Sequence, residues 1–483
     1  MVVVSGTVLV LCPALVNGLP FFYFDSTTYI EQIAKALKVI LPSSGAAQAA
    51  SLAPVEPVVR TTVDFGAPEA DRIVFSGRSV YYGLLAWIGW ASSIWLPVVI
   101  QAATLSWLVV TLFYHHVGRW WWQAALLSLA GLGFLSSAGL FAGLVMPDIW
   151  AGFLVLSLAL YWACHDRLSR GSRILILAIL AFSVLAHNSH LLLLAALLGC
   201  IALARLFAAR SDRAPLSRFI LPLAALCIGV AGHLIYAGAV RVAYDAKLMS
   251  RPHITAHLVD LGPGTSLIRD SCPESGFALC AYADRLPVDW ISFLFARDPG
   301  TGVFAAVPVA VQKSLIQEQA GFAVQTLIHY PVQTLFGLAG DGLSQLWTLG
   351  IGDVALDSTS ESVIAQSFPP DLASALADSL VYDRPHLIRV LYRLIQISSA
   401  AAAVFLLCYA AWRGTRMGRA APELERVILL MIAGLVLNAL ICGILASPYG
   451  RFQARIVWLL PLAAALLLSH LAASGNRAKR ITS

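Results

Sequence analysis

The side chains best suited to chemistry in this chain are ionisable groups that border long apolar segments. Two are carboxylates, two are imidazoles and three are guanidinium groups: Asp25, Asp148, His187, His190, Arg78, Arg451 and Arg455. A charged group at the centre of a bilayer costs roughly 2.5–3.5 kcal/mol or more, so ionisable residues in such surroundings are functional hypotheses by default. Most of them stand in four short motifs: YFDSTTY, VMPDIW, AHNSH and SPYGRFQAR.

Together these residue types suit the transfer of a group from a lipid phosphate. A guanidinium fork matches phosphate oxygens, and cations stabilise the charge that develops on a phosphate leaving group. A carboxylate or an imidazole can accept the proton of an acceptor hydroxyl. Each group also has an ordinary explanation: the acids as solvated or cap-like residues at helix starts, the histidines as polar turn residues, and the arginines as interfacial anchors.

The composition predicts the elements that must position these groups. The 483 residues are 59% hydrophobic and only 12% charged, whereas soluble domains have about 25% charged residues. This composition predicts an all-α polytopic membrane protein. A helical span needs roughly 20 apolar residues, which gives about ten candidates: 4–24, 94–114, 122–145, 147–164, 173–187, 190–208, 218–240, 394–412, 427–446 and 453–473.

The distribution of basic residues predicts the orientation. With the N-terminus in the cytoplasm, basic residues fall in every cytoplasmic loop and in the tail: Arg119, Arg167, Arg170, Arg173, Arg205, Arg210, Arg213, Arg218, Arg413, Arg416, Arg419, Arg426, Arg477, Lys479 and Arg480. This agrees with the positive-inside rule, and it explains the net charge of +6 without a nucleic-acid partner. The candidate residues then all lie at the non-cytoplasmic level. Residues 1–24 lack a basic start and a cleavage site, which favours a retained span over a signal peptide.

Three blocks follow: residues 1–240 with seven spans and a long outside loop, 25–93; a large outside segment, 241–393; and three more spans in 394–483. The loop opens with apolar residues at helical spacing from Tyr29 onward, which predicts a helix lying in the membrane interface. Segment 331–350 is apolar enough to dip into the bilayer. Cys272 and Cys280 are the two cysteines of the outside segment, which predicts a disulfide in an oxidising compartment.

These features resemble the GT-C class of integral-membrane glycosyltransferases, which includes the protein O-mannosyltransferases and the lipid A aminoarabinose transferases. The resemblance rests on the acid after the first span (YFDSTTY), the long first loop with its interfacial helix, the Asp in PDIW, the outside segment after span seven, and YGRFQARIVWLLP. Ser26 follows Asp25 where many relatives carry a second acid, which favours a single carboxylate. Whether a divalent cation, Mg²⁺ or Mn²⁺, takes part stays open, and no cofactor is certain.

The resemblance implies a polyprenyl-phosphate sugar donor, a glycolipid, polysaccharide or protein acceptor, and an active site on the periplasmic side of a bacterial cytoplasmic membrane. Asp25 would act as general base and Asp148 would orient the acceptor or a cation. Arg451, Arg455, Arg78 and His190 would hold the donor phosphate. We also expect His187, Tyr29 and Tyr449 to contact the substrate.

Three other functions remain open. An O-antigen polymerase or ligase that uses polyprenyl-diphosphate glycans would concentrate its catalytic groups around Arg251, His253, His257 and Arg269. A transporter or flippase would need charges near the midplane, where His233 is the one candidate. A non-catalytic partner in polysaccharide export would release no lipid phosphate from any donor.

Overall fold

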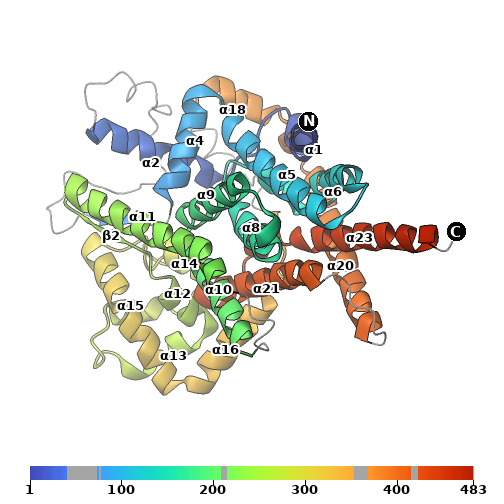
Figure 1. The fold of residues 1–483 in the computed structure, drawn as a ribbon. Helices are drawn as coiled ribbons and strands as arrows, with labels where there is room; N and C mark the ends of the chain where they lie inside the picture. Colours follow the sequence, from blue (N-terminus) through green and yellow to red (C-terminus); the bar gives the residue numbers. More distant parts are fainter. Residues whose placement is uncertain (41–72, 76–77, 208–214, 353–367, 415–421, 482–483) are drawn as a thin grey trace.

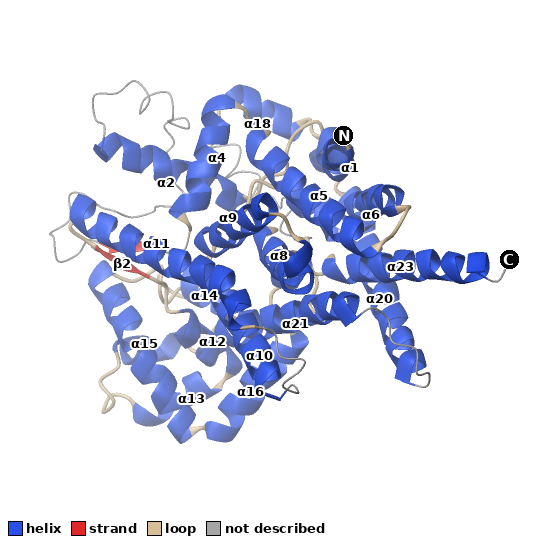
Figure 2. Ribbon diagram, in the orientation of Figure 1, coloured by secondary structure: helices blue, strands red, loops and turns tan. Residues whose placement is uncertain are grey.

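The computed structural model describes residues 1–40, 73–75, 78–207, 215–352, 368–414 and 422–481 (Figure 1). In this part of the chain nearly all regular structure is α-helical, and the only sheet is a pair of three-residue strands (Figure 2). The expected all-α class is therefore confirmed. Residues 41–72 of the expected loop 25–93 lie outside the described residues.

Six described helices are long and apolar enough to cross a membrane, as in a multi-pass membrane protein. They are α5 (Leu96–His116), α10 (Asn188–Phe207), α11 (Ile220–Tyr244), α20 (His386–Gly414), α21 (Pro422–Leu445) and α23 (Leu459–Ile481). Four shorter apolar helices occupy the other expected spans: α1 (Val2–Asn17), α6 (Trp121–Leu135), α8 (Trp150–Cys164) and α9 (Arg170–Ala186). A 15-residue helix such as α8 is only about 22 Å long, so the count of ten spans stays a prediction.

Helix α8 lies at the centre of the bundle, between α5, α9 and α21 (Figure 1). All of its residues are buried, as expected of a helix that is apolar all round. Gly152 allows α8 to approach the chain before α23, because a Cβ there would lie 2.3 Å from the Trp458 ring. Asp148, two residues before α8, is consequently held inside the protein.

The first apolar run ends its helix earlier than expected. Helix α1 stops at Asn17, Gly18 adopts a left-handed conformation with φ of 86°, and Pro20 follows, a common sequence after a helix end. The next residues are extended: the Phe21 N–H donates to the Gly143 carbonyl (2.8 Å), and the Val145 N–H donates to the Phe21 carbonyl (2.9 Å). Asp25 therefore lies in the first turn of a second helix, α2 (Phe24–Ile40), and not at the end of a continuous span.

The expected span 122–145 is also interrupted. Ser136 is extended between α6 and the short helix α7 (Ser137–Ala142), and its hydroxyl accepts a hydrogen bond from the Ala138 N–H. Helix α2 packs its buried face, which includes Tyr29, Ile30 and Ile33, against α4 (Val80–Ser92). A second helix, and not only lipid, thus covers the apolar side of the expected interfacial helix.

The segment between α11 and α20 in the sequence forms a second, smaller hydrophobic core. Its elements are β2 (Lys247–Met249), α12 (His253–Leu261), α13 (Pro263–Ser271), the 3₁₀ helix η5 (Ala278–Arg285), α14 (Trp290–Phe295), α15 (Val309–His329) and α16 (Pro331–Ser344). Phe293, Phe304 and Phe322 are buried at its centre. Strand β1 (Ile73–Phe75) pairs in parallel with β2, which joins the first loop to this segment.

The remaining elements are short and connect the larger ones. They are the 3₁₀ helices η2 (His165–Arg167) and η4 (Leu216–Phe219), and the helices α18 (Pro370–Ala377), α19 (Leu380–Asp383) and α22 (Gly450–Ala454). Cys272 and Cys280 are joined by a disulfide with a Cα–Cα distance of 5.6 Å, as the sequence led us to expect.

Candidate functional site

The first acidic residue of the candidate site is paired. Asp25, in the first turn of α2, forms an ion pair with Arg78, which directly precedes the N-cap of α4. The side chains of Asp25 and Arg78 are 13% and 18% exposed. Because α2 and α4 pack side by side, the ion pair is held at the start of both helices.

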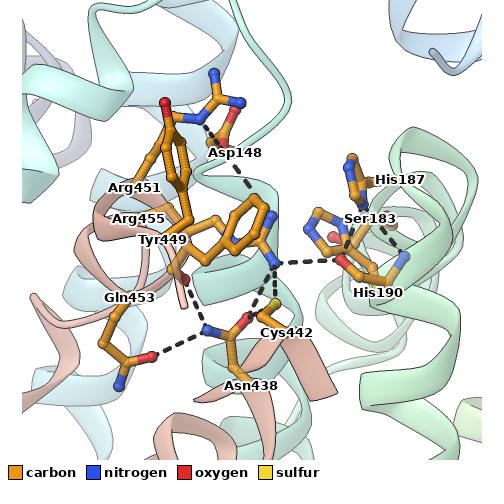
Figure 3. Close-up of polar contacts among 12 residues, drawn as sticks. Asp148, Ser183, His187, His190, Asn438, Cys442, Tyr449, Arg451, Gln453 and Arg455 are labelled. Atoms are coloured by element: carbon orange, nitrogen blue, oxygen red, sulfur yellow. Dashed lines mark hydrogen bonds and ion pairs between the residues drawn. The ribbon is translucent and has the colours of Figure 1, made fainter. Parts of the chain in front are cut away.

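The second acidic residue lies between two cations. Asp148 is 6% exposed and occupies the turn that leads into α8. The Nε atom of Arg451, in α22, and the Nη1 atom of Arg455, directly after it, each lie 3.9 Å from Asp148 Oδ1. The guanidinium of Arg451 also lies over the ring of Tyr23, 4.4 Å from the centroid. A helical turn thus presents two guanidinium groups to one buried carboxylate (Figure 3).

Tyr29 brings the two ion pairs into one place. Burial raises the pKa of its hydroxyl, and four charged groups act on it as well: Arg78 and Arg451 lower the pKa, whereas Asp25 and Asp148 raise it. Coulombic interactions decay with distance and dielectric, so a group that responds to all four charges lies among them. Five residues predicted for the site, from positions 25 to 451, are therefore neighbours.

The two histidines lie at the start of α10, on the Arg455 side of the cluster (Figure 3). Their ring centroids are 5.2 Å apart. Nδ1 of His190 donates to the Ser183 carbonyl (2.8 Å), which leaves Nε2 as the acceptor nitrogen of a neutral ring. His190 is fully buried, and its Nε2 has no partner among the described residues. His187 accepts the Ser189 N–H at 3.2 Å through its own Nδ1.

Arg455 holds three helices together. Its side chain is 2% exposed, and its Nη2 donates to Ser189 Oγ (3.2 Å) and to Asn438 Oδ1 (3.0 Å) and lies 3.5 Å from Cys442 Sγ. These contacts connect α10, α21 and α22. Because Nη2 of Arg455 is engaged by these neighbours, its geometry suits a positioning role, whereas the sequence suggested a contact with the donor phosphate.

The structure adds residues that the main sequence hypothesis did not include. Asn438 donates to the Phe452 carbonyl (2.7 Å) and to Gln453 Oε1 (3.1 Å), and so shapes the loop that carries Arg451. The sequence did contain a signal for Asn438, because a polar side chain inside an apolar span is a candidate functional residue. Tyr449, which the sequence hypothesis did include as a substrate contact, precedes α22 and packs its ring against Trp290, with centroids 5.9 Å apart.

Arg251 reaches the site from the second core. Phe75 pairs with Met249 in the parallel strands β1 and β2. Arg78 and Arg251 follow these two residues closely in the sequence, at the same end of the strands. The Arg251 guanidinium lies 4.6 Å from the Phe75 ring centroid and 5.1 Å from that of Phe295. Burial and Arg78 lower its pKa to about 10, and Asp25 acts in the opposite direction. A third cation is therefore fixed next to the Asp25–Arg78 pair.

The other residues considered for a polymerase have different surroundings. Burial, with the charges of Arg251 and Arg78, lowers the pKa of His253 to about 4, which places His253 near Arg78. His257 is buried and bridges Asp341 Oδ2 (2.7 Å) and the Ile444 carbonyl (3.0 Å). Arg269 is exposed, and His233, proposed under a transporter, has its Nε2 3.3 Å from the Val184 carbonyl.

A cavity of about 370 Å³ adjoins Arg78. Ser79 and Tyr81 line it from α4, Asn188 from α10, and Val230 and Leu234 from α11. Leu234 is 67% exposed on α11, so this cavity has Arg78 and an exposed residue of a candidate span in its lining.

Neither a metal site in the described residues nor a similar known protein identifies the chemistry of this cluster. Across the described ranges, no group of three or more His, Cys, Asp or Glu side chains is arranged to hold a metal ion. Comparison with family models, with curated proteins and with solved structures found no match. The kinship with GT-C glycosyltransferases consequently stays a prediction.

Proposed function

We propose that this chain is a membrane glycosyltransferase that moves a sugar from a polyprenyl-phosphate donor to an acceptor hydroxyl. The observation that carries the proposal is the cluster around Tyr29, where two carboxylates and two guanidinium groups from distant segments act on one side chain. Such a cluster can bind an anionic leaving group and accept a proton within the same volume, which are the two requirements of the reaction.

In this proposal the donor phosphate binds Arg78 and Arg451, and the polyprenyl chain occupies the cavity between α4, α10 and α11. Charge-assisted hydrogen bonds from guanidinium to phosphate are among the strongest available to a protein. Binding of the phosphate to Arg78 releases the Asp25 carboxylate from its ion pair. Asp25 is then free to accept a proton, so donor binding prepares the base.

The reaction itself is a displacement at the anomeric carbon. The acceptor oxygen forms a bond to that carbon while the bond from carbon to the phosphate oxygen breaks, which inverts the configuration. The proton of the hydroxyl moves to Asp25, and the polyprenyl phosphate leaves with the electron pair. Asp148 keeps Arg451 and Arg455 aligned, and positioning within the cluster supplies part of the rate.

Two aspects of the setting belong to the same proposal. The basic loops on the other side of the bundle favour a periplasmic site in a bacterial cytoplasmic membrane. The acceptor is a glycolipid, a polysaccharide or a protein.

A ligase or polymerase that uses polyprenyl-diphosphate glycans is the second candidate. Arg251 favours it, because this third guanidinium lies next to Arg78 and has no hydrogen bond or ion pair with the described residues. A donor with two phosphate groups has more anionic oxygens to occupy a third cation. The two candidates differ in their donor, and one assay can separate them.

The test is a transfer assay with purified protein in lipid vesicles. Polyprenyl-monophosphate sugars and polyprenyl-diphosphate glycans are each supplied with membrane extract as acceptor, with and without Mg²⁺ or Mn²⁺, and released lipid phosphate is measured by mass spectrometry. We expect release from a monophosphate donor and a large loss in Asp25→Asn. The matched control is Asp383→Asn, whose carboxylate is 65% exposed and pairs with the exposed Arg384. Release of lipid phosphate from diphosphate donors alone would favour the ligase or polymerase over the glycosyltransferase. No release from any donor would refute both candidates.

A further inference from the structure

The corner between α15 and α16 carries a large apolar surface. Eight large hydrophobic side chains between residues 321 and 347 are exposed, by 40% to 77%: Val324, Leu327, Ile328, Val332, Leu335, Phe336, Leu343 and Trp347. The only Asp, Glu, Lys or Arg in this stretch is Asp341, which is paired with His257. Exposed apolar patches of this kind mark binding sites for proteins or membranes.

Along α15 the apolar character increases towards Pro331, where α15 meets α16. The first half of α15 exposes Ser314 and Gln317, and Glu318 there caps the backbone of η5. The second half of α15 and the first half of α16 expose Ile328 and Phe336, together with three polar residues, Gln325, His329 and Gln333. An apolar surface that begins in the second half of α15 and continues along α16 to Trp347 is the pattern expected of an element that lies in a lipid surface.

The depth of α16 is set by its contact with a candidate span. Gly342 lies against Leu440 and Ile444 of α21, and Gly443 of α21 lies against the Asp341 backbone. Helix α21 ends at Leu445, so these contacts fall within about 8 Å of its end. Helix α16 therefore lies at the level of the last turns of the span, beside α21 in Figure 1.

We propose that the α15–α16 hairpin is inserted into the adjacent bilayer leaflet, with Phe336 and its apolar neighbours among the acyl chains. The occupant of the patch is lipid because the patch continues the surface of α21, a candidate membrane span, at a similar depth, and its one acid, Asp341, is paired with His257. This inference does not depend on the glycosyltransferase proposal, since it rests on the depth and composition of the hairpin alone.

Insertion of the hairpin would also determine the depth of the loop that carries Arg451. Gln345, directly after α16, accepts the Tyr449 N–H (2.7 Å) and donates to the Tyr449 carbonyl (3.0 Å). The backbones of Gly350 and Gly450 are in contact as well, since a Cβ on Gly450 would lie 2.6 Å from the Gly350 Cα. The hairpin and the loop with Arg451 thus move together, and lipid insertion holds Arg451 at the depth of a lipid headgroup.

Photocrosslinking tests the proposal in the full chain. A benzophenone amino acid replaces Phe336, or Ile328 in a second variant, and the protein is reconstituted in vesicles of phosphatidylethanolamine and phosphatidylglycerol with labelled acyl chains. Leu407, 70% exposed on the candidate span α20, is the lipid-facing reference, and Gln317 in the polar half of α15 is the aqueous reference. Each variant is first compared with the unmodified chain by thermal unfolding.

We expect positions 336 and 328 to crosslink to lipid at the level of position 407 and above that of position 317. A crosslinked dimer at 336 would show that a second copy covers the patch, and would overturn the proposal. Crosslinking as weak as at position 317 would place the hairpin in water, with the same consequence. Because catalysis is not part of the readout, failure of the glycosyltransferase proposal leaves this result unaffected.

Discussion

The pairing of Asp25 with Arg78 gives the sharpest test of how donor binding and proton transfer are connected. Both side chains are less than a fifth exposed, so the pair lies between an exposed ion pair, worth up to about 1 kcal/mol, and a fully buried pair, which costs about 3–5 kcal/mol when one partner is removed. We therefore expect Asp25→Asn and Arg78→Gln each to lower the free energy of unfolding by about 2 kcal/mol.

The double variant separates stability from catalysis. Removing both charges leaves no unpaired ion, so the double variant should be more stable than the sum of the single losses by about 1–2 kcal/mol, within the range observed for contacting pairs. Activity should not recover, because a general base contributes about 10²–10⁴ in rate and asparagine cannot replace it. Denaturant titration in micelles and the transfer assay provide the two readouts. Additive stability losses, or a double variant with restored transfer, would refute the reasoning.

Three further predictions follow from other features of the structure. Asp148→Asn leaves Arg455 buried without its carboxylate and should cost about 3–5 kcal/mol of unfolding free energy, measured by denaturant titration; unchanged stability would contradict the pairing. The pKa of His253 is lowered to about 4 from 6.5, so the unfolded chain takes up the proton first as the pH falls. Stability should decline from about pH 6.5 to about pH 4, and His253→Gln should flatten that part of the profile. Reduction of the Cys272–Cys280 disulfide, which closes a loop of eight residues, should destabilise η5 by about 2.5 kcal/mol, detectable as faster amide exchange there but not in α8.

Composition and charge were sufficient to predict the all-α architecture, and they selected several ionisable groups that the fold brings close together. The helices fall where apolar runs of suitable length occur, and α8 is central because it has no polar face. Two predicted spans, 4–24 and 122–145, are not single continuous helices in the structure, although the sequence contains residues that favour helix ends there. Gly18 and Pro20 end α1 before Phe24, and Ser136 divides 122–145, because these residues favour backbone conformations outside a helix.

Contacts between distant segments could not be read from periodicity. The parallel pairing of residues 73–75 with 247–249 has only three residues in each strand, too short to show an alternating pattern. It nevertheless brings Arg251 to the site. The role of Arg455 was likewise hidden, since its partners Asn438 and Ser189 come from two other helices. Sequence spacing identified which side chains could act, whereas the fold determined which of them hold the others in place.

The central claim is that Arg78 and Arg451 belong to one site for a lipid phosphate. The most direct test is to measure the binding of polyprenyl phosphate to the purified protein in nanodiscs by native mass spectrometry. Arg78→Gln and Arg451→Gln should each weaken binding about tenfold or more, the loss of one charge-assisted hydrogen bond, whereas Arg384→Gln at an exposed position should bind as the unmodified chain does. Equal binding by all four proteins would contradict the account.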